Sequence, residues 1–402
     1  MVGAADYYRR TGDVKFVRRV TPALRTALWN FQSELDASKT GLLDPERYGV
    51  DVSTPVYGIH DQALALQGLR AMAGVWAGTQ QPFLANSATA IANRLASGLR
   101  AAVGASTTRL ADGSLFIPVA LLDRTQRPFG ALTDSQEGSY WNLVMPYALA
   151  SGLFAPGSSE AQGVLDYMLN HGSRLLGLVR FRAFTNSGKP GYRSPGSDDV
   201  YGTNLVRFLA DNHRPDQLVL SLYGKLGADM TPGTFVSGEG STIGPVDGEY
   251  YRSMFRPPNT ANNAFFLETL RLMLVHETVG ADGAPSGLEL AYSTPRSWLR
   301  AGRRIVVRGA RTSFGPVSYS LVARRGSVRV RVAVSARAPR TLRLRLRLPV
   351  GERVAGVSGR GGRSFDRYDA RSGTVDLSGL RGRVDLVVAY RHVPVSDTVT
   401  GQ

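Results

Sequence analysis

The spacing of apolar residues along the chain changes near residue 285. Before this point apolar residues recur with the period of helices, and after it they alternate with polar residues as in strands. The pattern therefore predicts two domains, a helical domain over residues 1–285 and a β-domain over residues 286–402. Helices are predicted over residues 13–35, 60–78, 82–103, 140–153, 158–171, 199–212, 215–228 and 261–277.

The β-domain has a two-residue alternation. In "VRVRVAV" (328–334) and "LRLRLRLPV" (342–350), arginines alternate with valine or leucine, as expected of strands with one buried and one solvated face. Glycine-rich turns such as "SGRGGRS" (358–364) separate the runs. This pattern predicts an antiparallel β-sandwich.

The connections between the predicted helices alternate between short and long. If consecutive helices are antiparallel, all long connections emerge at the same end of the domain. Long connections often carry function, so we expect a toroid of helical hairpins with one elaborated face. The long connections cover residues 36–59, 104–139, 172–198 and 229–260.

Composition excludes several classes of function. The net charge of +16 comes from residues 286–402, where 23 arginines and no lysine accompany 7 acidic residues. Because these arginines follow the strand period without an interleaved aromatic stacking motif, we expect no nucleic-acid partner. No segment approaches the roughly 18 uncharged apolar residues that cross a bilayer, so no membrane partner is expected. The oligomeric state is not specified by the sequence.

The absence of cysteine and of metal-binding motifs restricts the chemistry that the chain can perform. The chain has no cysteine, which excludes disulfides and thiolate chemistry but leaves the compartment open, extracytoplasmic locations included. The first residues, "MVGAADYYRRTGDVKF", lack the apolar core of a signal peptide. No HExxH pattern or tight cluster of acids and histidines is present, so we expect neither a metal nor another cofactor.

Three helical stretches resemble the hairpins of six-hairpin glycosidases: "DYYRRTGDVKFVRRVTPALRTAL" (6–28), "GLLDPERYGVDVSTPVYGIHDQALALQGLRAMA" (41–73) and "YWNLVMPYALASG" (140–152). "YSTPRSWLRAGRRIVVRGARTSFGPVSYSL" (292–321) is similar to the start of their C-terminal β-domain. The resemblance implies an (α/α)6 toroid followed by a β-domain, and a carbohydrate substrate. The family toroid has twelve helices and eight are predicted here, so either the chain is the C-terminal part of a longer protein or its ring is open.

The stretch "FVSGEGSTIGPVDGEYYRSMFRPPN" (235–259) places acids among glycines and prolines, and we expect neither helix nor strand there. The resemblance implies that inverting members carry the general base in this connection. Glu239 is the first candidate, because its flanking glycines let the backbone approach a ligand closely. Glu249 is the rival base. The alternative without a catalytic role is that Glu239 is an exposed residue of a glycine-rich turn.

Two residues compete for the general acid. Asp51 lies in the connection 36–59, where the resemblance places the acid. Glu137 precedes Tyr140 and Trp141, whose rings would bury it and raise its pKa as an acid requires. Their alternatives are a capping or ion-pairing role for Asp51 and a helix-dipole carboxylate for Glu137.

Aromatic and histidine residues in or beside the long connections complete the expected site, because their rings supply stacking area and a polar handle for a sugar. We therefore predict an inverting glycoside hydrolase. The alternatives are a non-catalytic or degenerate carbohydrate-binding protein, or a toroid-fold polysaccharide lyase with His60 or a tyrosine as base. The expected substrate-binding residues are Tyr57, His60, Tyr140, Trp141, Tyr201, Glu249 and Tyr250.

Overall fold

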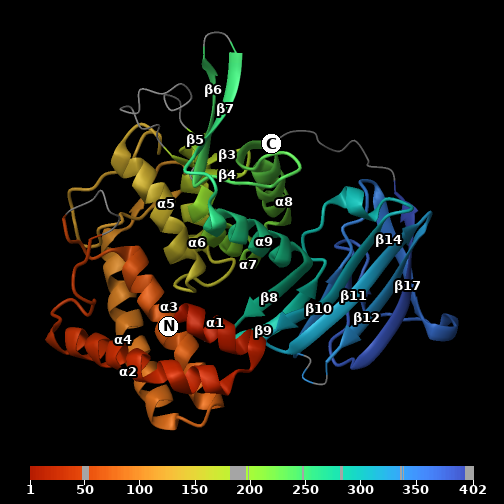
Figure 1. Ribbon diagram of the computed structural model, residues 1–402, viewed down its shortest axis with the longest axis horizontal. Coiled ribbons are helices and arrows are strands. Elements are labelled where there is room, and N and C mark those ends of the chain that lie inside the picture. The colour runs from red at the N-terminus through yellow and green to blue at the C-terminus, as the bar shows by residue number, and fades with distance from the viewer. Residues whose placement is uncertain are drawn as a thin grey trace. The chain divides into compact units, whose positions relative to one another are not determined.

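The computed structural model describes residues 1–47, 54–181, 196–197, 199–246, 249–280, 284–335, 337 and 339–393. The chain forms two compact units, called here unit 1, around Met1–Thr269, and unit 2, around Leu270–Gly280 and from Pro285 onward (Figure 1). The expected domain boundary at residues 285 and 286 stays a prediction.

Unit 1 is built mainly from helices. Each of the eight predicted helical ranges overlaps an observed helix, with ends that differ by a few residues. Nine α-helices are present in the described part of the chain: α1 (Val2–Thr11), α2 (Val14–Ala37), α3 (Ile59–Gly78), α4 (Pro82–Ser106), α5 (Gln136–Ala150), α6 (Ser159–Asn170), α7 (Gly202–Asp211), α8 (Pro215–Gly224) and α9 (Thr260–Leu274).

Helix α1 is absent from the prediction. It is short and polar, and Ala5 is its one buried residue, so it shows no apolar stripe in the sequence. Gly12 ends it in the left-handed conformation, with φ 69°, which favours glycine. Asp13 then caps α2 by accepting a hydrogen bond from the Phe16 amide at 2.9 Å.

Alternate helices of unit 1 pack against one another. Helices α1, α3, α5 and α7 lie side by side in that order, while α4 packs on α3 and α8 packs on α7. The contact face of α3 is fully buried at Leu66, Leu69 and Trp76.

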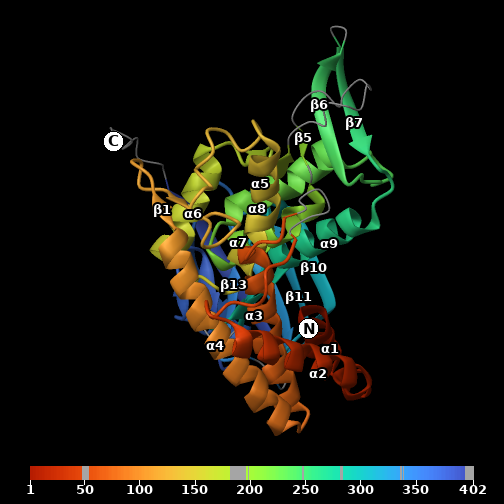
Figure 2. The same cartoon turned by 90° about the vertical axis from the view of Figure 1, so that its left-hand side faces the viewer.

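The connections expected to lack regular structure contain short strands. The expectation for residues 235–259 is wrong, because two strands pair there with Val246 opposite Glu249. The Asp-Gly dipeptide at 247–248, between β-branched and aromatic runs, is a strong sequence signal for a hairpin. The hairpin extends away from the helices of its unit (Figures 1 and 2). The strands are β1 (Thr108–Arg109), β2 (Leu115–Phe116), β3 (Arg174–Leu175), β4 (Leu178–Phe181), β5 (Gly196–Ser197), β6 (Gly240–Val246) and β7 (Glu249–Phe255), the last five forming one sheet in that order.

Unit 2 consists of two five-stranded sheets, ordered β10-β11-β12-β17-β14 and β15-β16-β13-β9-β8. A single cluster of buried apolar residues draws on both sheets. The strands are β8 (Val275–Val279), β9 (Pro285–Leu290), β10 (Arg304–Thr312), β11 (Gly315–Arg324), β12 (Ser327–Val334), β13 (Thr341–Arg345), β14 (Glu352–Gly359), β15 (Tyr368–Asp369), β16 (Thr374–Asp376) and β17 (Gly382–His392).

The predicted alternation is confirmed along β12 and β13, but in the run 342–350 the strand ends at Arg345 and Arg347 is buried instead of exposed. Along β12, Val328 and Val330 are buried whereas Arg329 and Arg331 are exposed. Two further expectations differ from the structure. Strand β13 pairs with β9 in parallel, so the unit is not purely antiparallel. The predicted last helix ends at Leu274, and the chain continues as β8.

Candidate active site

The start of α3 is held by backbone pairing with a distant segment. The Ile59 amide donates to the Val119 carbonyl at 2.9 Å, and the Leu121 amide donates to the Tyr57 carbonyl at 2.9 Å. Gly58 precedes the helix, and a Cβ there would lie 2.5 Å from Asp61 Oδ2. Glycine at this position therefore lets the Asp61 carboxyl group fold back against the backbone.

Asp61 and His60 have unusual electrostatics for neighbours at a helix start. Burial, and secondarily the charge of Glu46, raise the pKa of Asp61 to about 6. Burial also lowers the pKa of His60 to about 4, so the imidazole is neutral at higher pH. The helix dipole favours an ionised carboxylate at this position, but the burial of Asp61 outweighs it.

The contacts of Asp61 fit a proton donor. His60 Nε2 lies 3.2 Å from Asp61 Oδ1, and the Asp61 side chain is 28% exposed. Asp61 Oδ2 is buried and has no hydrogen-bond partner within the described residues. A carboxyl group that keeps its proton up to about pH 6 and still reaches the surface can act as a general acid.

Glu137, in the first turn of α5, does not have the buried surroundings that were predicted for a general acid. Glu137 is exposed in the first turn, where Ser135 caps the helix by accepting a hydrogen bond from the Gly138 amide at 3.0 Å. The burial expected from Tyr140 and Trp141 does not occur, because both rings point into the interior. Glu137 thus has the surroundings of a helix-terminal carboxylate.

The two rings on α5 pack against other aromatic residues. Trp141 is fully buried, contacts Phe116 and Tyr167, and donates from Nε1 to the Ile117 carbonyl at 2.7 Å. Tyr140 is 9% exposed and meets Phe181 edge to face at 5.7 Å. Trp141 therefore presents no exposed ring face on which a sugar could stack.

Glu239 precedes β6 and is fixed through its backbone. Its amide donates to the Phe255 carbonyl at 2.8 Å, and its carbonyl accepts from the Val200 amide at 3.3 Å. A Cβ at Gly238 would lie 2.5 Å from the Phe255 carbonyl oxygen, so this glycine permits close strand pairing rather than close approach to a ligand. The Glu239 side chain is 23% exposed, with Oε2 at 3.6 Å from Nη1 of Arg256.

The other predicted residues occupy varied positions. Tyr57 is half-buried just before α3, and Tyr201 is half-buried in the 3-10 turn η1 (Asp199–Tyr201) before α7. Glu249 and Tyr250 lie on β7. Asp51 lies outside the described residues.

One continuous set of contacts, called here the connecting belt, links the starts of α3, α5 and α7. It comprises residues 57–59, residues 117–121, β4, β5 and β6. Trp141 joins residues 117–121 to α5, and Asn142 Nδ2 on α5 donates to the Arg180 carbonyl of β4 at 2.8 Å. Phe181 then pairs with Gly196, and Ser197 pairs with Ser241.

The connecting belt links the segments that carry Asp61, Glu137 and Glu239. Asp61 follows its first segment, Glu137 lies in the first turn of α5, and Glu239 precedes its last strand. Asp61 was missed in the sequence because an acid in a first helical turn is ordinary. The burial that makes it unusual comes from residues remote in sequence.

The described residues offer neither a metal site nor a membrane-spanning helix. No cluster of three or more histidine, aspartate or glutamate side chains could hold a metal ion there. In the same residues, no helix combines the length and apolar character needed to cross a membrane.

Comparisons with known proteins identify the fold. No protein-family profile and no curated protein matches the sequence. An alpha-L-rhamnosidase structure from Dictyoglumus thermophilum matches with a TM-score of 0.50 at 10% identity, over 96% of this chain and 38% of its own. The alpha-L-rhamnosidase of Streptomyces avermitilis, complexed with L-rhamnose, matches with a TM-score of 0.50 at 14% identity, over 95% of this chain and 32% of its own.

A more distant likeness is to a GH127 beta-L-arabinofuranosidase from Geobacillus stearothermophilus, with a TM-score of 0.40 at 13% identity over 97% of this chain and 71% of its own. The two rhamnosidase matches confirm the resemblance to six-hairpin glycosidases at the level of the fold. The chain spans about a third of the length of these two rhamnosidases, at 38% and 32%.

Proposed function

We propose that this chain is an inverting glycoside hydrolase in which Asp61 is the general acid and Glu239 the general base. The observation that supports this most strongly is the contrast between the two carboxyl groups attached to the connecting belt. Asp61 retains its proton up to about pH 6, whereas Glu239 forms an ion pair with Arg256. Glycoside hydrolysis needs one protonated and one ionised carboxyl group.

In the proposed reaction Asp61 gives its proton to the glycosidic oxygen as the bond to the anomeric carbon breaks. Glu239 takes a proton from a water molecule, whose oxygen attacks the anomeric carbon from the opposite face. The products are a free sugar of inverted configuration and an alcohol, and proton exchange with solvent restores both carboxyl groups. Inverting sites of this kind hold their carboxyl groups about 6.5–9.5 Å apart.

Glu137 and Asp51 remain the alternative acids. Glu137 lies in the first turn of α5, but it is exposed and lacks the burial that distinguishes Asp61. Asp51 lies in the connection that leads to Asp61, so variants of both residues belong in the same activity test.

The fold supports a carbohydrate substrate. We propose that α1, α3, α5 and α7 form the inner row of a partial helical toroid, with α4 and α8 as outer helices, and that unit 2 is a β-sandwich. L-Rhamnosides are the first substrates to test, because one matching rhamnosidase structure was solved with L-rhamnose.

The test is a glycan and aryl-glycoside panel assayed with the wild-type chain and the variants Glu239→Gln, Asp61→Asn, Glu137→Gln and Asp51→Asn. Glu160→Gln is the matched control, because Glu160 is an exposed acid in the first turn of α6. We expect Glu239→Gln and Asp61→Asn to lose about 10²–10⁴-fold in turnover while the other variants stay active.

Three outcomes would contradict the proposal in different ways. Near-normal turnover by Glu239→Gln would remove its role as base. Sugar binding by a wild-type chain that hydrolyses nothing would favour the carbohydrate-binding alternative. An unsaturated product that absorbs ultraviolet light would identify a lyase.

A further inference from the structure

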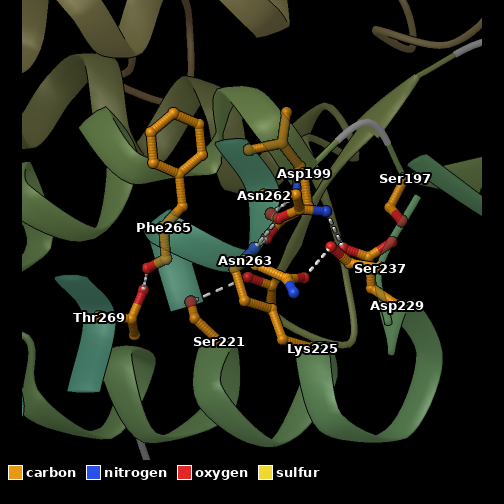
Figure 3. Close-up of polar contacts among 12 residues, drawn as sticks. Ser197, Asp199, Ser221, Lys225, Asp229, Ser237, Asn262, Asn263, Phe265 and Thr269 are labelled. Carbon is orange, nitrogen blue, oxygen red and sulfur yellow. Dashed lines mark hydrogen bonds and ion pairs between the residues drawn. The ribbon is translucent and has the colours of Figure 1, made fainter. Parts of the chain in front are cut away.

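Four polar residues form a buried network beneath the β6–β7 hairpin (Figure 3). Lys225 forms an ion pair with Asp199 and donates a hydrogen bond to Asn262 Oδ1. Asn262 Nδ2 donates to Asp229 Oδ2. The four residues are called here the Lys225 network, and none is more than 3% exposed.

The Lys225 network comes from three separate elements. Asp199 lies in η1, Asn262 lies in the first turn of α9, and both Lys225 and Asp229 lie in the π-helix η2 (Lys225–Asp229) that extends α8. A π-helical turn is rare and frequently occurs at functional sites. Here it directs an ammonium group and a carboxyl group, four residues apart, toward the same amide of Asn262.

The network contains two carboxyl groups and one cationic group. Burial, and next the charge of Asp199, raise the pKa of Asp229 to about 7, although Lys225, Asn262 and Ser241 act in the opposite direction. Arg174 also interacts electrostatically with Asp199. With Asp229 protonated, the charges of Lys225 and Asp199 balance.

The network contacts the backbone on both sides of Glu239. Asn262 Nδ2 donates to the Gly238 carbonyl at 2.9 Å. Val200, which directly follows Asp199, donates its amide to the Glu239 carbonyl at 3.3 Å. Ser241, which interacts with Asp229, has its hydroxyl 3.1 Å from that of Ser197.

We propose that the Lys225 network is a positioning device for Glu239, which fixes residues 238–241 so that the Glu239 carboxylate keeps one orientation toward the attacking water. This inference rests on the proposed role of Glu239 as the general base. Burying an ion pair is weak evidence for stability, since apolar residues of similar size often do as well. What the polar network adds is directional hydrogen bonds to the peptide groups that carry Glu239.

The decisive variant is Asn262→Ala, which removes the bond to the Gly238 carbonyl. Its matched control is Thr269→Val on the same helix, where a buried hydroxyl that donates to the Phe265 carbonyl at 2.8 Å is replaced without a change in shape. We expect Asn262→Ala to lower kcat by about 10²-fold with KM nearly unchanged, because a small misplacement of a reacting group has an effect of this size. Thr269→Val should keep both constants.

Amide hydrogen exchange supplies a second measurement that does not depend on activity. Exchange at residues 238–241 should be faster in Asn262→Ala than in the wild-type chain and Thr269→Val. If Asn262→Ala does not fold, Ser241→Ala serves instead, because it leaves every charge in place and removes the hydroxyl contacts with Ser197 and Asp229. We expect it to lower kcat by about tenfold with the same change in exchange.

The outcomes separate this inference from the proposed function. Retained kcat, or a raised KM with unchanged kcat, in an active chain would overturn the positioning role while leaving Glu239 as the base. If the wild-type chain hydrolyses nothing, the proposed function fails. Faster exchange in Asn262→Ala but not in Thr269→Val would then still support the conclusion that the Lys225 network fixes the backbone of residues 238–241. Unchanged exchange in Asn262→Ala would overturn that conclusion.

Discussion

Asp61 and Glu239 are both carboxylic acids attached to the connecting belt, but their surroundings differ in burial and in neighbouring charge. Asp61 lies at a helix start, beside the neutral His60 and the negatively charged Glu46, and burial raises its pKa to about 6. Glu239 lies at the base of a hairpin, beside a guanidinium group that is 72% exposed. We propose that these different environments give the two carboxyl groups opposite duties.

The two regions also differ in how the carboxyl group is fixed. Asp61 is positioned by a helix start and a glycine that admits its side chain. Glu239 is positioned through its backbone, by strand pairing on one side and the Lys225 network on the other. A proton donor needs a controlled pKa, whereas a base that activates water needs a controlled direction.

The strongest test of this contrast uses leaving groups of different acidity. Asp61→Asn should lose about 10³-fold on a glycoside with a poor leaving group but far less on a dinitrophenyl glycoside, which needs no proton to depart. Glu239→Gln should lose activity about equally on both substrates. Equal losses in Asp61→Asn, measured as kcat/KM, would mean that Asp61 does not donate the proton.

The pH dependence of activity gives the next largest effect. As the acid, Asp61 must carry its proton, so kcat/KM should fall about tenfold per pH unit above about pH 6. His60 does not titrate in this range, because its pKa is lowered to about 4. The residual activity of Asp61→Asn should lack this alkaline limb, and an unchanged limb in that variant would assign it to another group.

The pH dependence of Tm tests the electrostatics of Asp229 in the Lys225 network, which contacts the backbone around Glu239. The raised pKa of Asp229 stabilises the folded chain below about pH 4, and this contribution is lost as the pH rises toward about 7. Asp229→Asn stays neutral, so its Tm should gain a few degrees relative to the wild-type chain between pH 4 and pH 8. Asp61 is present in both chains, and its own contribution cancels in the difference. A constant difference in Tm would contradict the raised pKa.

The smallest effect is expected at Arg256. Its ion pair with Glu239 is largely exposed, and such pairs contribute less than about 1 kcal/mol. Arg256→Gln should therefore change kcat/KM by less than about fivefold, and less still at high salt. A much larger loss would mean that Arg256 itself binds the substrate.

The sequence correctly predicted those helices and strands whose side chains follow a regular local periodicity. Alternation of arginine and valine along β12 identified both the strand and its buried face, because each side chain reports directly on its own position. The sequence also singled out Glu239 as a candidate base because of its flanking glycines. In the structure the glycine before it permits close strand pairing, so this reason does not hold and the role stays a prediction.

Features that depend on distant residues were missed. The pKa of Asp61 reflects burial and a charge on a separate segment, which no local pattern records. The predicted helix over residues 215–228 concealed the π-helical turn of Lys225 and Asp229, because an apolar helical pattern does not distinguish the two windings. Trp141 was expected at a sugar site, yet its ring is enclosed by Phe116 and Tyr167 from elements far along the chain.

If Asp61 protonates the leaving group while Glu239 directs water to the opposite face of the sugar, hydrolysis must invert the anomeric carbon. Proton NMR of the first product released by the wild-type chain, recorded before mutarotation, reveals the stereochemical outcome. We expect an anomer opposite to that of the substrate. A first product that retains the substrate configuration would contradict it.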